Sequence, residues 1–452
     1  MTTKRFKYQL PKAEDIAPIA LAVSAVGMHV DQTPARALWA AVEAAAGTRI
    51  PRPAPADSLA GSRDDAALFR AATLRGVFRH WAPDGQRVQE FVEGYPVPAY
   101  FGLPSIAEGN VKQSELVRKY VAMMRRSLQD GAGMAFHDIS PRSSLLASTA
   151  SKSTWPDLFT YFDKAADLAA LMLFAEDGPA ARSTFGGWPP RPDETPERTF
   201  ARERRADGDL AEVFAGLMLT RSSSVQRLRE LAEHVIDASR TVSFGDGRQG
   251  RTAHGFARWS SDFVEPYTTH RARFPFQPTE YVPDPWSKAQ CDQFDAMPVL
   301  SWLYRPRVAE YRDADGTALS DARCAEQLRA TLEAAVGEPL EGKAPARIFY
   351  DVGRGDASGP RRAALTTALR AVLPDIDLLD VKQGYDLSRR LGDAGAATMV
   401  AGVGLASIAA WETGGTALVI HARRNDSAIV LPVRPSSDAH RQKYRKRPYD
   451  AA

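Results

Sequence analysis

Cysteine is scarce in this sequence, since only Cys291 and Cys324 occur in 452 residues. Neither has a second cysteine or a histidine at metal-ligand spacing, so no metal site is predicted. The two lie far apart in the chain, and so low a cysteine content favours a reduced cytosolic pair, with one disulfide as the alternative in an exported protein. No cofactor is predicted.

Long apolar runs are also missing. Pro18 and Ser24 interrupt the stretch from Ile16 to Met28, so no signal peptide is predicted. The longest run, Ala396 to Trp411, has sixteen small or apolar residues, whereas a membrane span needs about 20. We therefore predict a buried, closely packed segment there.

The chain has little net charge of either sign. Its formal net charge is +3, and residues 434–452 hold six Arg or Lys against two Asp, which is +4 and leaves −1 for residues 1–433. Binding to nucleic acid needs a basic face on a fold, so it is not predicted. Residues 435–452 are expected to form a basic disordered tail.

The first half of the sequence alternates between strand and helix patterns. Ile19 to Val30 is a strand-like run, and Thr33 with Pro34 marks the start of a helix that Gly47 closes. Further strands are predicted at residues 96–102, 171–174 and 213–220, and further helices at 117–128 and 154–168.

The second half repeats this alternation. Strands are predicted at 299–304, 307–312 and 346–352, a helix from Ser320 to Gly337, a helix at 361–373, and a terminal hairpin of residues 416–422 and 428–433. Both halves begin with an apolar strand and a capped helix, which suggests a distant internal duplication. We predict an α/β protein of two α/β domains with mixed sheets flanked by helices, at residues 1–240 and 291–434.

Residues 241–290 form a predicted irregular connection with an unusual aromatic content. Nine aromatics from Phe244 to Trp286 follow neither a period of two nor one of 3.6. They either fill the junction between the domains or form an exposed apolar patch rimmed by arginine, as protein-binding surfaces do. The second interpretation predicts partner contacts through Trp259, Phe263, Arg271, Arg273, Phe274 and Phe276.

Catalytic motifs are missing as well. No serine lies in the Gly-x-Ser-x-Gly turn of an α/β hydrolase, and no His-Glu-x-x-His pair occurs. Asp351 and Asp356 could act as an acid-base pair or cap the next helix. We predict no catalytic residue and no enzyme. The alternative is an atypical α/β hydrolase-like enzyme, because Ser, His and Asp of such a site need to meet only in the folded protein.

Two glycine-containing segments suggest ligand sites only weakly. The loop Gly353 to Gly359 precedes Arg361 and Arg362 and could hold an anion, but it lacks the lysine of a phosphate-binding loop. Gly402 and Gly404 are not followed by the third glycine of a dinucleotide site. A tight turn and close packing explain these glycines better.

Three stretches of the second half resemble the type VI secretion lipase-adapter family. They are FQPTEYVPDPWSKAQCDQFDAMPVLSWLYRP at 276–306, RIFYDVG at 347–353 and VKQGYDLSRRLGDAG at 381–395. The first half is similar more loosely, through residues 23–45, 131–134, 155–177 and 214–227.

The resemblance implies a cytoplasmic bacterial adapter without catalytic residues. Its partners would be a lipase effector and the spike protein of a type VI secretion system, and it would help to load the first onto the second. Members of the family often carry an N-terminal membrane anchor or signal, and this chain shows none.

Overall fold

The computed structural model describes slightly more than half of the chain: residues 19–31, 33–50, 97–102, 136–138, 154–165, 168–178, 211–221, 225–226, 228–229, 232, 235–236, 240–243, 249–252, 258–259, 286, 288–295 and 297–444. The elements of the first half are β1 (Ala20–Val30), β2 (Thr33–Pro34), α2 (Ala35–Ala44), β3 (Val97–Gly102), β4 (Phe136–Asp138), α6 (Thr154–Lys164), β5 (Ala170–Asp177) and β6 (Val213–Thr220). Those of the second half are β11 (Ser301–Tyr304), β12 (Arg307–Glu310), α12 (Asp321–Leu340), β13 (Arg347–Asp351), α13 (Ser358–Val372), β14 (Gly384–Asp386), α14 (Leu387–Arg390), η3 (Gly395–Ala397), α15 (Thr398–Thr413), β15 (Ala417–His421), β16 (Ser427–Pro435) and α16 (Asp438–Lys443).

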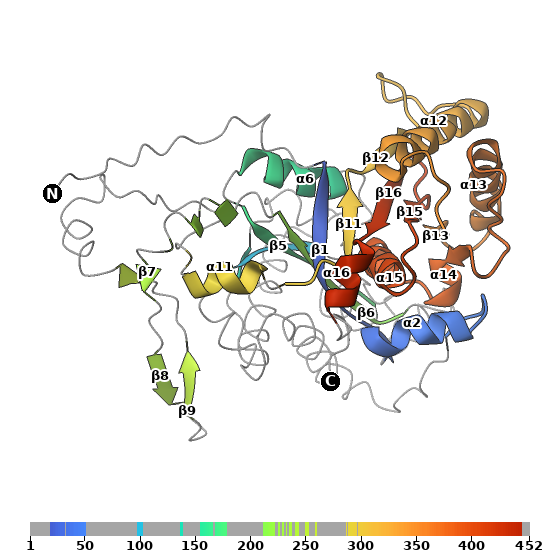
Figure 1. Ribbon diagram of the computed structural model, residues 1–452. Helices are drawn as coiled ribbons and strands as arrows, with labels where there is room; N and C mark the ends of the chain where they lie inside the picture. Colours follow the sequence, from blue (N-terminus) through green and yellow to red (C-terminus); the bar gives the residue numbers. More distant parts are fainter. Residues whose placement is uncertain are drawn as a thin grey trace, which may run out of the picture.

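The strands of both halves join one twelve-stranded mixed sheet (Figure 1). Its order is β14-β13-β15-β16-β11-β1-β6-β5-β3-β4. On each side of the central pair the inner two pairings are antiparallel and the outer two are parallel. The sequence of parallel and antiparallel pairings is therefore the same from either edge of the sheet to its centre. There β1 pairs antiparallel with β11, with Ala22 opposite Trp302.

This symmetry confirms the α/β fold and the predicted internal duplication. In each half the strands occur in space as third, second, fourth, fifth and first along the chain: β4-β3-β5-β6-β1 and β14-β13-β15-β16-β11. Equivalent helices follow the first strand, α2 and α12, and precede the fourth, α6 and α15. The residue limits of the predicted domains remain a prediction.

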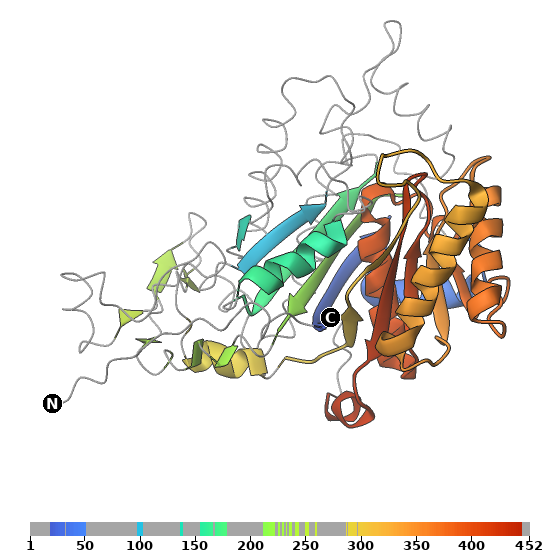
Figure 2. The same ribbon diagram turned by 90° about the horizontal axis from the view of Figure 1, so that it is seen from above.

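Helices cover the sheet of the second half on both faces. Strand alternation places Ile348, Leu418 and Val430 on one face, in a core shared with α12 and α13. Phe349, Val419 and the other alternate residues face α15, in a larger core that also contains α2 and α6. Figure 2 shows α12 and α13 side by side at one end of the molecule.

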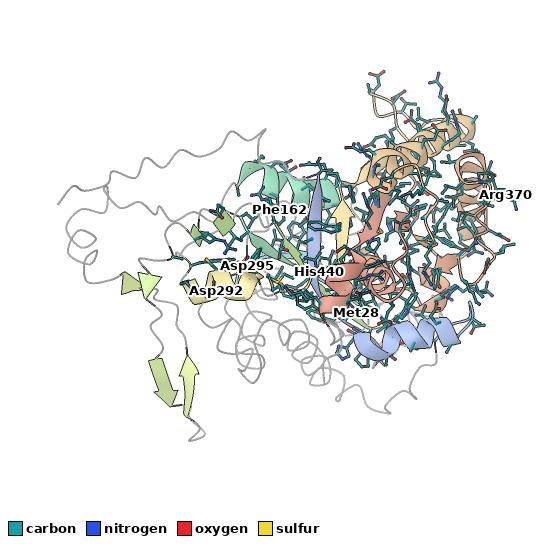
Figure 3. All side chains as sticks on the ribbon, in the orientation of Figure 1. Met28, Phe162, Asp292, Asp295, Arg370 and His440 are labelled. Atoms are coloured by element: carbon teal, nitrogen blue, oxygen red, sulfur yellow. The ribbon has the colours of Figure 1, made fainter. Side chains whose placement is uncertain are left out.

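The apolar segment predicted from Ala396 to Trp411 is the helix α15, and its burial is confirmed. By length and composition, residues 395–413 are long and apolar enough to cross a membrane, but 89% of that segment is buried inside the protein. Its glycines allow close packing, as predicted. A Cβ built on Gly404 would lie 2.1 Å from the Cε of Met28 in β1 (Figure 3) and 3.1 Å from Val26 Cγ1.

A methyl group at Gly404 should therefore destabilise the protein. We expect Gly404→Ala to lower the free energy of unfolding by about 1–3 kcal/mol, because Met28 must leave its position. The matched control is Gly337→Ala in α12, where an added Cβ meets nothing within 4 Å. That change should stabilise the helix by up to about 1 kcal/mol. Melting temperatures of both variants test the contrast, and a loss of equal size in both would contradict it.

Several predicted element ends differ from the structure. α2 begins at Ala35 rather than Pro34, because Thr33 and Pro34 pair with the end of β1. α12 passes the predicted end at Gly337 and continues to Leu340. The reason is packing, since Pro339 and Leu340 are buried in this extra turn. Glu341, in a left-handed conformation with φ of 57°, ends the helix instead.

The predicted disordered tail is wrong for residues 435–444, since Pro435 ends β16. Residues 438–443 form α16, which packs beside the end of α15. Arg441 donates to the carbonyl of Trp411 at 3.0 Å, and Val299 donates its backbone N–H to Nε2 of His440 (Figure 3) at 2.8 Å. The contact with Trp411 satisfies a carbonyl at the end of α15. Both contacts order a segment that is basic by composition. Residues 445–452 lie outside the described residues.

The predicted irregular connection contains short regular elements. β7 (Val235–Ile236) pairs with β10 (Arg258–Trp259), β8 (Arg240–Ser243) pairs with β9 (Gln249–Thr252), and α11 (Lys288–Asp295) precedes β11. In Figure 1 the β8-β9 hairpin lies apart from the large sheet. The predicted helix at 117–128 lies outside the described residues.

Candidate functional site

A polar cluster lies where the three parallel strands of the second half end. Asp351 is the last residue of β13, His421 is the last of β15, and Ser388 follows β14. Ser388 Oγ donates a hydrogen bond to Asp351 Oδ1, which also accepts from the backbone N–H of Gly353 at 2.8 Å. His421 Nδ1 lies 3.4 Å from Asp351 Oδ2. We call Asp351, Ser388 and His421 the Asp351 cluster.

Arg423 and Asp393 close the cluster on one side. The Arg423 guanidinium binds the Asp393 carboxylate through two hydrogen bonds of 2.6 and 2.7 Å and lies 3.9 Å from Asp351 Oδ2. Burial by itself raises the pKa of Asp351, but the contacts with His421 and Arg423 outweigh burial, and the net pKa lies below its usual range. The pKa of Asp393 is lowered in the same way, against burial, by Arg423. Both carboxylates are therefore ionised at neutral pH.

The segment that carries Ser388 and Asp393 also connects the two halves of the protein. The backbone carbonyl of Asp393 accepts from Ala211 N at 2.8 Å, and the backbone N–H of Ala396 donates to Asp177 Oδ2 at 2.7 Å. Ala211 precedes β6 and Asp177 ends β5, so both belong to the first half. We call residues 381–396, together with the residues of the first half that they contact, the junction.

Arg390 is the largest polar side chain buried in the junction. It is 2% exposed and donates to the carbonyls of Val42 at 3.3 Å, Val381 at 2.6 Å and Gly384 at 2.9 Å. Its guanidinium lies 4.0 Å from the ring centroid of Tyr385. In the described residues no carboxylate lies within ion-pair distance of Arg390, so backbone carbonyls and one aromatic ring satisfy the cation.

An aromatic cluster completes the junction. Tyr385 stacks on Trp39 of α2 and on Phe349 of β13, with centroid distances of 5.7 and 4.8 Å. Its hydroxyl donates to Glu43, also on α2. Burial raises the pKa of Tyr385 to about 12, so the hydroxyl stays protonated and keeps donating at neutral pH.

The Asp351 cluster has the residue types of a serine hydrolase in a different arrangement. In such an enzyme the serine donates to the histidine, which the carboxylate orients. Here Ser388 and His421 both contact the same carboxylate, and all three side chains are at most 2% exposed. Ser388 donates its hydrogen bond to Asp351, whose lowered pKa makes this carboxylate a weak base. The cluster holds strand ends and the turn at Gly353 together.

The other candidate sites in this region are used by the fold. Asp356 is exposed, whereas Asp351 is buried and accepts from the backbone N–H of Gly353 in the turn that follows β13, so the acid-base alternative for these two carboxylates gains no support. Arg361 donates to Asn425 Oδ1 at 2.6 Å, and Arg362 donates to Asp386. Gly353 and Gly355 have positive φ, as a tight turn requires. The anion-site interpretation gains no support from this loop.

The predicted partner-binding residues remain a prediction. The backbone of Trp259 lies in β10, and its side chain lies outside the described part of the chain. Phe263, Arg271, Arg273, Phe274 and Phe276 lie outside the described residues as well. Cys291 is buried and Cys324 half-buried, and both are free thiols.

Exposed apolar residues that the sequence did not single out lie elsewhere. Among the described residues the large apolar side chains exposed to solvent are Ile19, Trp302, Leu379 and Val381. Trp302 lies on β11 between two buried neighbours, so the alternation of side chains along a strand could have predicted its exposure. Leu379 and Val381 occur in the stretch IDLLDVK, where carboxylates interrupt an apolar run.

Solved structures similar to this chain include ketosynthases. The match with a type II PKS ketosynthase in complex with its acyl-carrier protein covers 93% of this chain and 100% of the other, with 10% identity and a TM-score of 0.46. The match with the ishigamide ketosynthase/chain length factor covers 92% of this chain and 100% of the other, with 12% identity and a TM-score of 0.45. The match with a ketosynthase of the bacillaene synthase from Bacillus subtilis 168 covers 92% of this chain and 71% of the other, with 10% identity and a TM-score of 0.45. Such scores carry no information on activity.

Family models match both halves of the chain. The model of the N-terminal part of the type VI lipase adapter protein Tla3 matches residues 19–193, and that of its C-terminal part matches residues 300–435. The second match contains RIFYDVG and VKQGYDLSRRLGDAG, whose residues build the Asp351 cluster and the junction. Together the two matches cover most of the chain, which therefore belongs to the type VI lipase adapter protein family.

Proposed function

We propose that this protein is a cytoplasmic adapter that binds a type VI lipase effector and helps to load it onto the spike protein of the secretion apparatus, without catalysis of its own. The observation that carries the proposal is the family match over both halves of the chain. An adapter must present fixed surfaces to its partners, since ordering flexible surfaces costs binding free energy.

The junction supports this proposal because it fixes the two halves relative to each other. It contains buried hydrogen bonds from Ala211, Ala396 and Arg390 across the boundary between them. The strands β1 and β11 add a direct backbone pairing at the centre of the sheet. A partner that contacts both halves thus meets a preorganised scaffold.

Co-expression with a lipase encoded beside this chain tests the proposal. We expect the two proteins to co-elute in size-exclusion chromatography at micromolar concentration, and the purified complex to bind the spike protein more tightly than the lipase alone does. Separate elution of adapter and lipase would contradict the first step. Equal spike binding with and without the adapter would contradict the second.

An esterase assay of the purified adapter tests the alternative of an atypical hydrolase. We expect no turnover of short-chain esters or phospholipids. Ser388→Ala is the informative variant, because Ser388 is the hydroxyl that contacts Asp351. Turnover by the wild type that Ser388→Ala abolishes would assign an enzymatic role to the cluster and contradict the proposal.

A further inference from the structure

One loop of the second half carries two exposed apolar side chains close together. Leu379 is 78% exposed and Val381 is 40% exposed, and both lie in residues 374–383, between α13 and β14. This loop is at the end of the molecule where α13 and α14 lie (Figure 1). The side chain of Val381 lies partly against Gly47 of the first half, where an added Cβ would be 2.8 Å from Val381 Cγ1, so Leu379 is the more exposed of the two. Solvent exposure of a large aliphatic side chain beside a second one costs free energy, which binding of a partner would recover.

The backbone of this loop is rigid. Leu379 N donates to Asp377 Oδ1 at 2.9 Å, Lys382 N donates to Asp380 Oδ1 at 2.8 Å, and Gly384 N donates to the Asp380 carbonyl at 2.8 Å. Leu378 is buried, and a Cβ on Gly384 would lie 2.1 Å from its carbonyl oxygen. The loop therefore presents Leu379 and Val381 in fixed positions, which reduces the entropy lost on binding.

The loop is also acidic. Asp375, Asp377 and Asp380 are exposed and Lys382 is its one cation, so its charge is 1 − 3 = −2. The first two of these carboxylates flank the buried Ile376, and the third lies between Leu379 and Val381. The exposed apolar side chains are thus surrounded by negative charge, which favours a partner surface with Lys or Arg around an apolar pocket.

The neighbouring strand edge is short and partly occupied by the chain itself. β14 is the outermost strand on this side, and such edges can accept a strand from a partner. Here Arg390 donates to the Gly384 carbonyl and Asp380 accepts from the Gly384 N–H, so the chain itself occupies the first residue of this three-residue edge. The side chains of the loop are therefore the stronger candidate for binding at this end of the molecule.

We infer that Leu379 and Val381, with Asp375, Asp377 and Asp380, form a docking surface for an apolar pocket rimmed by Lys or Arg on the lipase effector. The inference rests on the proposed adapter function and names the surface that serves it. Trp302 is a weaker candidate. It is 38% exposed, and Arg434, which lies opposite it on β16, already binds Glu341 at 2.6 Å and Tyr304 at 3.1 Å.

Leu379→Ser tests the surface, with Ile19→Ser as the matched control. Ile19 is 62% exposed at the start of β1, so it is a comparable apolar side chain in another place. We expect Leu379→Ser to weaken lipase binding at least about tenfold and Ile19→Ser to change it less than about twofold. Isothermal titration calorimetry gives the affinities, and melting temperatures within the error of the wild type show that both variants fold.

A charge variant tests the recognition by cations. Asp375 makes no side-chain hydrogen bond within the described residues, so Asp375→Lys changes the charge and leaves the turns intact. We expect it to weaken binding about threefold to tenfold in about 50 mM salt and to have little effect in about 500 mM salt, where surface charges are screened.

Each other outcome has a definite meaning. If the wild type does not bind the lipase at all, the proposed function fails. If the wild type binds and folded Leu379→Ser binds equally well, only this docking surface is refuted. Loss of binding in Trp302→Ala alone would also refute it and assign the partner to β11. If Leu379→Ser instead converts a wild-type dimer into a monomer and keeps lipase affinity, the occupant is a second copy of the chain, and the inference is again refuted.

Discussion

Replacement of Arg390 by alanine is expected to lower the free energy of unfolding by about 3–5 kcal/mol, among the largest effects of any single change in this protein. The side chain is buried and donates to three backbone carbonyls that lie in both halves of the molecule. Alanine would leave these acceptors without donors inside the protein and would remove the contact with the ring of Tyr385.

Lysine should not rescue this position. The guanidinium of Arg390 reaches Val42 on one side and Val381 and Gly384 on the other through separate nitrogens, whereas an ammonium group donates from a single atom. We expect Arg390→Lys to lose at least about half of the stability that Arg390→Ala loses. Burial also lowers the pKa of Arg390, and the same burial acts more strongly on a lysine, whose pKa shifts readily.

Arg389→Ala is the matched control, since Arg389 is adjacent and its side chain is exposed. It should change the free energy of unfolding by less than about 0.5 kcal/mol. Denaturant unfolding followed by tryptophan fluorescence measures all three variants. If Arg390→Ala and Arg389→Ala unfold at the same denaturant concentration, the role assigned to the junction is wrong.

The regular elements of this fold could be predicted because their signals are local. Val213 to Thr220 is an apolar run bounded by polar residues, and it is β6 without any shift of its ends. The hairpin of β15 and β16 follows the turn residues between two apolar runs. The duplication was visible in one strand-helix pair, and the structure extends it to five strands in each half.

Elements whose ends depend on tertiary packing could not be predicted as well. Glycine is a frequent helix end by propensity, yet α12 continues past Gly337 because Pro339 and Leu340 gain burial. α16 is basic and exposed, and its order comes from Arg441 and His440, which bind groups more than 29 residues away in the chain. No local pattern contains this information.

The candidate site was the least predictable part. Asp351, Ser388 and His421 are 37 and 33 residues apart in the chain, and the parallel pairing of β13 with β14 and β15 brings them together. The sequence marked Asp351 as the end of a strand, which is correct, but offered only Asp356 as a partner for acid-base chemistry. The side chains that contact Asp351 follow β14 and end β15, and strand order is a property of the whole sheet.

Replacement of Asp351 by alanine should have a second large effect, again about 3–5 kcal/mol of lost stability. Asp351 accepts from Ser388 and Gly353 and faces His421 and Arg423, and it is fully buried. Its removal leaves the Gly353 N–H unsatisfied and takes one of two carboxylates from Arg423. Asp356→Ala, in the same loop but exposed, should change stability by less than about 0.5 kcal/mol.

The same carboxylate should make stability depend on pH in the acid range. The pKa of Asp351 is lower in the folded protein than its usual value of about 3.9, so the unfolded chain binds the proton more readily. The stabilisation is complete above that value and is lost as the pH falls below it towards the lower folded pKa. Asp393 has the same sign, whereas the pKa of Asp386 is raised, mainly by burial, and acts in the opposite direction.

Asp351→Asn separates charge from hydrogen bonding, because the amide oxygen can still accept from Gly353 and Ser388. We expect it to be less destabilising than Asp351→Ala at pH 7, and its melting temperature to fall less steeply than that of the wild type from about pH 5 to pH 3. The wild type and Asp356→Ala should show the same slope. Parallel slopes for the wild type and Asp351→Asn would mean that another carboxylate governs acid unfolding and that Asp351 is not ionised in the folded protein. Because the cluster joins strand ends beside the junction, loss of lipase binding in Asp351→Asn at pH 7 should follow its loss of folded protein and not exceed it.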